Sequence, residues 1–189
     1  MALVARHDVT AEEFFAMTWL PPTAQLIDGE VVVVNSPSLR HQQIAGRLFY
    51  RLMQWVEAGS ARGMCGIPVD VRINDHNVYA PDLWWFRDGN VPDIDEVRLP
   101  WLPDLAVEVL SPSTRRYDLG VKCERYEQTG VPELWIIDPA PRATDPARIL
   151  RRSEPKAPTF DLDRRLSLDG ELTSPQLSGF ALGLRDLLA

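Results

Sequence analysis

A carboxylate inside an apolar strand constrains this chain more than any other feature of its sequence. The stretch 105–113 reads Leu-Ala-Val-Glu-Val-Leu-Ser-Pro-Ser, so the acid Glu108 is the only polar residue among the first six. A short apolar run with β-branched residues that stops at Ser-Pro-Ser is typical of a strand buried on both faces. Burial of a carboxylate is costly unless the group is paired or holds a cation. Glu108 therefore predicts either a buried salt bridge, for instance to Lys122 or Arg125, or a functional site.

A second acid and a lysine favour the functional site. Asp82 follows Pro81 at the head of another apolar segment. Lys122 falls in a predicted helix in which Asp118 and Tyr126 are each four residues away and share its face. Two acids with a nearby lysine form the constellation of a metal-dependent phosphodiester hydrolase. The acids would hold Mg²⁺ or Mn²⁺, which prefers oxygen ligands and acidifies a bound water, and the lysine would orient the attacking water or stabilise developing charge.

Other residues extend this candidate site. Glu30, after an Asp-Gly turn, is either a third carboxylate ligand or an exposed residue of a hairpin. The backbone carbonyl of Val109, directly after the buried acid, is a candidate metal ligand. His41 either contacts phosphate or belongs to the cap region of a helix, and the cap region is the preferred interpretation. Arg115 and Arg116 are candidates for a local phosphate-binding patch.

Periodicity and turn chemistry predict the remaining elements. Thr10 and Glu13 form a capping-box pattern, and apolar residues recur every three or four positions between 44 and 56. The expected order is a capped helix after Thr10, a hairpin at Asp28-Gly29, a helix over about 40–58, strands at 69–73 and 78–86, a loop over 87–103, the buried strand at 105–110, a helix over 118–128 capped by Asp118, a strand at 133–138, a loop over 140–147, and β-meander strands before a short helix at 184–188.

Composition limits the kind of protein this is. A chain of 189 residues, 45% of them hydrophobic, predicts a single domain over 1–189, with a motif-bearing core over about 10–139 and a β-rich C-terminal extension over about 140–189. No stretch approaches the roughly 18 apolar residues of a membrane helix, and the first residues lack a signal peptide's pattern, so we expect a cytoplasmic protein. The two cysteines are too few for a disulfide framework or a zinc site. A net charge of −7 argues against a nucleic-acid coat protein, but it is compatible with an enzyme that meets DNA through one local basic patch.

Several segments, in this order, resemble one family. They are Leu-Ile-Asp-Gly-Glu (26–30), Ser-Pro-Ser-Leu-Arg-His (36–41), Ala-Pro-Asp-Leu (80–83), Val-Glu-Val-Leu-Ser-Pro-Ser (107–113), Asp-Leu-Gly-Val-Lys (118–122) and Tyr-Glu-Gln-Thr-Gly-Val-Pro-Glu-Leu-Trp-Ile-Ile-Asp-Pro (126–139). The set resembles the Uma-type restriction endonucleases of the PD-(D/E)XK superfamily, and it covers roughly residues 10–139. As an ordered set the motifs are far more specific than any one of them alone.

The resemblance implies an α/β (α+β) fold of the restriction-endonuclease-like type, with a mixed central sheet flanked by helices. It implies Asp82 as the first motif acid, Glu108 as the second and Glu30 as an extra acid. The superfamily lysine usually follows the second acid by two residues, where this chain has Leu110. The resemblance implies that the lysine has moved to the following helix, as Lys122.

The function that follows is a Mg²⁺- or Mn²⁺-dependent endonuclease acting on DNA, with Asp82, Glu108 and Lys122 as catalytic residues. Many enzymes of this fold dimerise, so the resemblance leaves a homodimer open. Two alternatives remain at this point. One is a catalytically silent nucleic-acid-binding or protein-interaction module of the same fold, which the acidic overall charge favours. The other is a nuclease acting on RNA or a phosphodiesterase acting on a small nucleotide.

Overall fold

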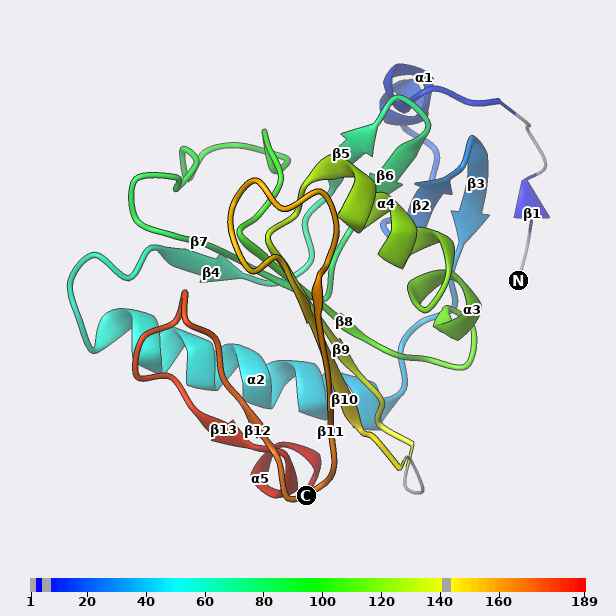
Figure 1. The fold of residues 1–189 in the computed structure, drawn as a ribbon. Coiled ribbons are helices and arrows are strands. Elements are labelled where there is room, and N and C mark those ends of the chain that lie inside the picture. Colours follow the sequence, from blue (N-terminus) through cyan, green and yellow to red (C-terminus); the bar gives the residue numbers. More distant parts are fainter. Residues whose placement is uncertain (1–2, 5–7, 141–143) are drawn as a thin grey trace.

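A six-stranded mixed sheet is the centre of the fold in the computed structural model, which describes residues 3–4, 8–140 and 144–189 (Figure 1). The first residues and part of the predicted loop at 140–147 therefore lie outside the described residues. β8 and β9 run parallel, whereas all other neighbouring strands of this sheet are antiparallel. In spatial order the strands are β11 (Leu162–Leu166), β10 (Ala147–Arg151), β9 (Glu133–Ile137), β8 (Leu105–Val109), β7 (Leu83–Phe86) and β4 (Met64–Gly66).

A smaller antiparallel sheet is built around the predicted hairpin. Its strands, in spatial order, are β1 (Leu3–Val4), β3 (Glu30–Val33), β2 (Ala24–Ile27), β6 (Asn77–Tyr79) and β5 (Val71–Asn74). Asp28 and Gly29 join β2 to β3 with φ values of +46° and +76°, as a two-residue hairpin turn requires. Helix α1 (Ala11–Ala16) begins with the predicted capping box: Thr10 accepts from the backbone N–H of Glu13, whose carboxylate accepts from the N–H of Thr10.

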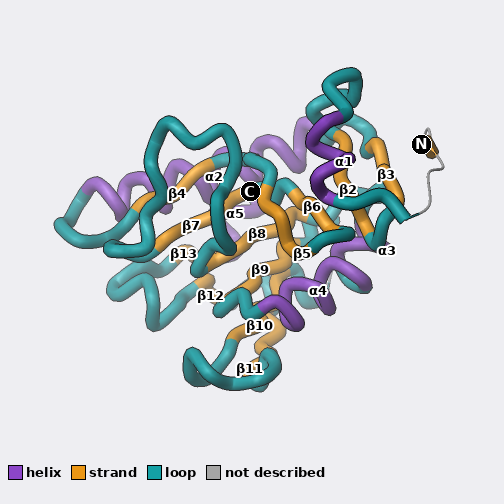
Figure 2. Tube along the Cα trace, turned by 90° about the horizontal axis from the view of Figure 1, so that it is seen from above, coloured by secondary structure: helices purple, strands orange, loops and turns teal. Residues whose placement is uncertain are grey.

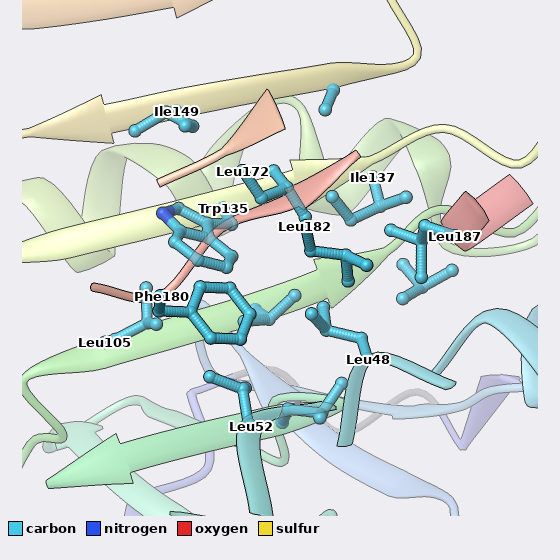
Figure 3. Close-up of a cluster of buried hydrophobic side chains, with 14 of the residues drawn as sticks. Leu48, Leu52, Leu105, Trp135, Ile137, Ile149, Leu172, Phe180, Leu182 and Leu187 are labelled. Carbon is cyan, nitrogen blue, oxygen red and sulfur yellow. The ribbon is translucent and has the colours of Figure 1, made fainter. Parts of the chain in front are cut away.

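Helix α2 (Leu39–Glu57) covers one face of the main sheet, together with β12 (Glu171–Leu172), β13 (Leu182–Gly183) and α5 (Leu184–Leu188). Figure 3 shows Leu48 and Leu52 of α2 facing Phe180 and the β9 residue Trp135 in this core. The predicted apolar face of α2 is thus confirmed. Among the described residues, no helix combines the length and the apolar character that a membrane span needs.

The opposite face of the main sheet carries α3 (Arg115–Asp118), α4 (Val121–Thr129) and the smaller sheet (Figure 2). Tyr79 of β6 and Tyr126 of α4 pack there against Ala106 and Ile136. Side chains alternate along a strand, so Glu108, two residues after Ala106, also points to this face. The buried acid therefore lies beneath α4.

The structure corrects two details of the sequence interpretation. The predicted strand at 78–86 is two strands in different sheets, because β6 ends at Tyr79 and β7 begins at Leu83 after a corner at Ala80-Pro81-Asp82. Proline has no backbone N–H and cannot continue a ladder there. Asp118 does not cap a long helix: it is the last residue of α3, and α4 follows with Gly120 as its N-cap. Strand β4 was not predicted.

Gly63, just before β4, should be the glycine least tolerant of substitution. Its φ is +73°, and an added Cβ would lie 1.8 Å from the carbonyl oxygen of Phe86. Gly89 has a similar φ of +81° but has open space where its Cβ would be. We expect Gly63→Ala to lower the free energy of unfolding by at least about 2 kcal/mol more than Gly89→Ala. Equal urea midpoints for the two variants would contradict this reading of the β4–β7 packing.

Candidate active site

A cavity of about 220 Å³ lies where the smaller sheet, the start of α2 and the main sheet meet. Residues just before β7, on β8, and on α3 and α4 line it together with residues of β2 and α2. Its polar lining includes Gln25, His41, Asp82, Glu108, Asp118 and Lys122. Its apolar lining includes Pro22, Val34, Pro37, Pro68 and Ala80. The structure thus gathers three predicted catalytic residues and His41 around one space.

A buried charge network occupies the α4 side of the cavity. The Nζ of Lys122 lies 2.7 Å from Oε1 of Glu108 and 2.9 Å from Oδ1 of Asp118. The hydroxyl of Tyr126 donates to the same oxygen of Glu108 at 2.9 Å. The side chains of the three charged residues are at most 5% exposed. The sequence left a salt bridge and a functional site as alternatives for Glu108. The salt bridge to Lys122 is present, and both of its residues also line the candidate cavity.

Burial sets the protonation of this network. It raises the pKa of Glu108 to about 8, although the ammonium group of Lys122 acts to lower it. Burial alone would lower the pKa of Lys122, but the charges of Glu108 and Asp118 outweigh it and raise that pKa above its ordinary value. Lys122 is therefore charged at neutral pH. Of these two residues, Glu108 is the one whose charged form is disfavoured when burial and the neighbouring charges are taken together.

Asp82 lies on the other side of the cavity, held in place by two contacts. Its Oδ2 accepts the backbone N–H of Val109 at 2.7 Å, and its Oδ1 lies 3.0 Å from Nε2 of His41. Because Asp82 directly precedes β7 and Leu83 pairs with Val107, the antiparallel register brings the aspartate beside the end of β8. This places the first predicted acid next to the strand that carries the second.

His41 lies buried in the first turn of α2. Ser38 is the N-cap residue, and its side chain accepts the backbone N–H of His41, so the imidazole does not cap the helix but is turned to Asp82. Burial would lower the pKa of His41, yet the hydrogen bond and the charge of Asp82 raise it above its usual value. The His41 side chain therefore positions Asp82.

Three other predicted site residues do not line the cavity. Glu30 is the first residue of β3 and is half-buried outside the lining. Arg115 and Arg116 are exposed on α3. The guanidinium of Arg115 lies 2.7 Å from Asp138. That of Arg116 lies 4.9 Å from the ring centre of Tyr117.

Sequence reasoning missed Gln25. It lies on β2, whose four residues are all buried, and it lines the cavity. Among the described residues, the buried side-chain atoms without a hydrogen-bond partner are Oε1 of Gln25 and Nδ1 of His41. The signal was the one that singled out Glu108: a polar residue inside an apolar strand.

The donor set of the cavity fits a divalent cation only if carbonyl oxygens contribute. Within the described part of the chain, no three His, Cys, Asp or Glu side chains are grouped as a metal-binding cluster. Asp82 and Glu108 supply two carboxylates, and the unpartnered amide oxygen of Gln25 is a further oxygen donor in the same lining. Carboxylate, carbonyl and water oxygens are the ligands that suit Mg²⁺ and Mn²⁺. The chemistry of the lining is therefore compatible with these ions.

Comparison with known proteins agrees with a nuclease-like class. The chain aligns with a TM-score of 0.77 to the crystal structure of a protein from Anabaena variabilis described as a "putative nuclease belonging to DUF820". The two are 18% identical, and the alignment covers 95% of this chain and 97% of the other, so they share a fold. The predicted fold class, a mixed sheet flanked by helices, is confirmed.

The chain belongs to the Uma2 family, whose model, described as "Putative restriction endonuclease", matches residues 11–179. The match confirms the resemblance found in the sequence and extends it past residue 139 into the C-terminal strands. No curated protein sequence matches the chain.

Proposed function

We propose that this protein is a Mg²⁺- or Mn²⁺-dependent endonuclease that hydrolyses phosphodiester bonds of DNA. Asp82, Glu108 and the backbone carbonyl of Val109 would hold the cation, and Lys122 would assist the attacking water. One observation carries the proposal: an acid just before β7, an acid on the neighbouring strand β8 and a buried, charged lysine line one cavity of a nuclease-like fold.

The cation, when bound, would offset the charge of the phosphate and lower the pKa of a bound water. Residues of the chain would position and charge the groups around the cation. Asp118 keeps Lys122 charged and in place independently of Glu108, so the ammonium remains available to a water or to a developing negative charge. His41 and the N–H of Val109 fix both oxygens of Asp82.

A plasmid assay tests the proposal. Wild-type protein should convert supercoiled plasmid to nicked and linear forms with Mn²⁺ or Mg²⁺ and should stop when EDTA is added. Asp82→Asn should lose this activity because the amide keeps the shape of the side chain without its charge. Asp163→Asn is the matched control and should cut like wild type, because Asp163 lies on β11 outside the cavity lining and pairs there with Arg148 of β10. A wild-type protein that never nicks plasmid, at any concentration of either metal, would refute the proposal.

Cation affinity should rise with pH between pH 6 and 8. The pKa of Glu108 is raised to about 8, so below that pH the carboxyl is largely protonated and a cation must displace the proton. We expect Mn²⁺ affinity to increase by up to about tenfold per pH unit over this range. Calorimetry at pH 7 in buffers of different ionisation enthalpy should detect the release of about one proton per ion. Affinity that is independent of pH, without proton release, would contradict this assignment.

A second candidate function is the catalytically silent binding module. It is favoured by the closed charge network, because Oε1 of Glu108 already contacts both Lys122 and Tyr126. In that case Asp82 and Glu108 have a structural role only. Neither Mn²⁺ nor Mg²⁺ would then bind at millimolar concentration, with or without DNA. Binding of DNA without cleavage would distinguish this module from the enzyme.

A further inference from the structure

Gln25 is a polar residue that lines the cavity from a strand whose other residues are apolar. It is 9% exposed, and its neighbours on β2 are the buried apolar residues Ala24 and Leu26. Its amide oxygen is fully buried and has no hydrogen-bond partner among the described residues. A buried polar atom without a partner destabilises the fold, and a leucine in this position would avoid that cost. We therefore expect a water or an ion to contact this oxygen.

The surroundings of Gln25 favour an ion. The same cavity is lined by Asp82, which directly precedes β7, and by Glu108 of β8. An amide oxygen carries no proton and no charge, and it belongs to the class of oxygen donors that Mg²⁺ and Mn²⁺ accept. Two carboxylates leave most positions of an octahedral ion to carbonyl and water oxygens. The buried amide oxygen of Gln25 can bind an ion without giving up a hydrogen bond.

We propose that the side-chain oxygen of Gln25 is a ligand of the divalent cation held by Asp82 and Glu108. The inference rests on the proposed function and deepens it, because it assigns the contribution of the β2–β3 hairpin to Gln25 in place of Glu30. Glu30 lies beyond the turn at the start of β3 and does not line the cavity. A neutral ligand in this position also limits the negative charge of the site, which already includes Asp118.

Mn²⁺ binding to the metal-free protein tests the proposal without any assay of activity. Free Mn²⁺ is measured by electron paramagnetic resonance during titration of wild type, Gln25→Leu, Gln25→Glu and Gln43→Glu. Gln43→Glu adds the same charge at an exposed position of α2 and should change the Kd by less than about twofold. Gln25→Leu should weaken binding about tenfold, and Gln25→Glu should tighten it by a similar factor because it adds a charged ligand.

Two further measurements keep the test decisive. Gln25→Asn keeps the amide but withdraws it by one methylene, and it should weaken Mn²⁺ binding as Gln25→Leu does. Without metal, Gln25→Leu should melt no lower than wild type, because it removes an unpartnered polar atom. A lower melting temperature would mean that the amide has a structural partner, and this would overturn the proposal.

The inference and the proposed function fail in different ways. If wild type binds Mn²⁺, loses it in Asp82→Asn and is indifferent to Gln25→Leu, the inference is wrong and the nuclease proposal stands. The amide would then bind only water or substrate. If wild type binds no Mn²⁺ and nicks no plasmid, both are wrong.

Discussion

Glu108→Gln should reduce metal-dependent plasmid nicking by at least about 100-fold while leaving the protein folded. The amide is close in shape to the carboxyl and offers an oxygen to Tyr126 and Lys122, which contact Oε1 of Glu108 in the wild type. What it removes is the negative charge that a cation in the cavity requires. Mn²⁺ affinity should fall in parallel, as calorimetry would show.

The stability of Glu108→Gln separates loss of chemistry from loss of fold. The pKa of Glu108 in the folded state, about 8, is above its ordinary value of 4.5. Between pH 4.5 and 8 the folded state therefore binds a proton at Glu108 that the unfolded state has released. Stability from this group is therefore greatest below about pH 4.5 and is lost as pH rises toward 8. The glutamine does not titrate, so its melting temperature at pH 8 should equal or exceed that of wild type. Normal nicking by a well-folded Glu108→Gln would contradict a ligand role for Glu108.

Lys122→Met should give the largest loss of stability of any single substitution at the site, about 3–5 kcal/mol at pH 7. It removes the cation that lies between Glu108 and Asp118 and leaves two buried carboxyl groups facing each other. The pKa of Glu108 should rise further without the ammonium, so protonation of Glu108 would relieve part of the penalty and the loss should shrink toward pH 5. Urea unfolding at pH 5, 7 and 8 measures this trend.

A double variant distinguishes a catalytic lysine from a structural one. Asp118→Asn with Lys122→Met removes one buried carboxylate along with the ammonium and should recover a large part of the lost stability. Nicking should remain low in this variant because, among the described residues that line the cavity, Lys122 alone carries an ammonium. Recovery of both stability and nicking would show that Lys122 serves only the fold. The single variant Asp118→Asn controls for the loss of that aspartate.

Local sequence signals were sufficient for much of the fold. The capping box at Thr10, the turn at Asp28-Gly29 and the apolar periodicity of α2 depend on residues close in the chain, and all three are confirmed. The division of 78–86 between two sheets was missed because both parts are apolar and β-prone, and only tertiary pairing separates them. The three-residue β4 shows no alternation of its own, and at Gly66 it accommodates the ring of Trp84.

Part of the candidate site could also be predicted from the sequence, because it too depends on residues close in the chain. Glu108 was identified as a charge in an apolar strand. The four-residue spacing of Lys122 from Asp118 also predicted their contact, although the two residues lie in α4 and α3 and not in one helix. The pairing of His41 with Asp82 joins residues 41 positions apart and depends on how α2 meets the sheet. Gln25 is also a polar residue inside an apolar strand, but it is a weaker indication of a site than Glu108. A neutral amide in a strand has more structural explanations than a carboxylate.

A manganese-soaked crystal tests the central claim most directly, because the ion's anomalous signal marks where it binds. The account predicts an anomalous peak in the cavity at about 2.0–2.2 Å from carboxylate oxygens of Asp82 and Glu108. Lys122 should keep its contact with Asp118. A crystal with no peak at this place, with the contact between Lys122 and Glu108 still closed at high Mn²⁺, would contradict the account.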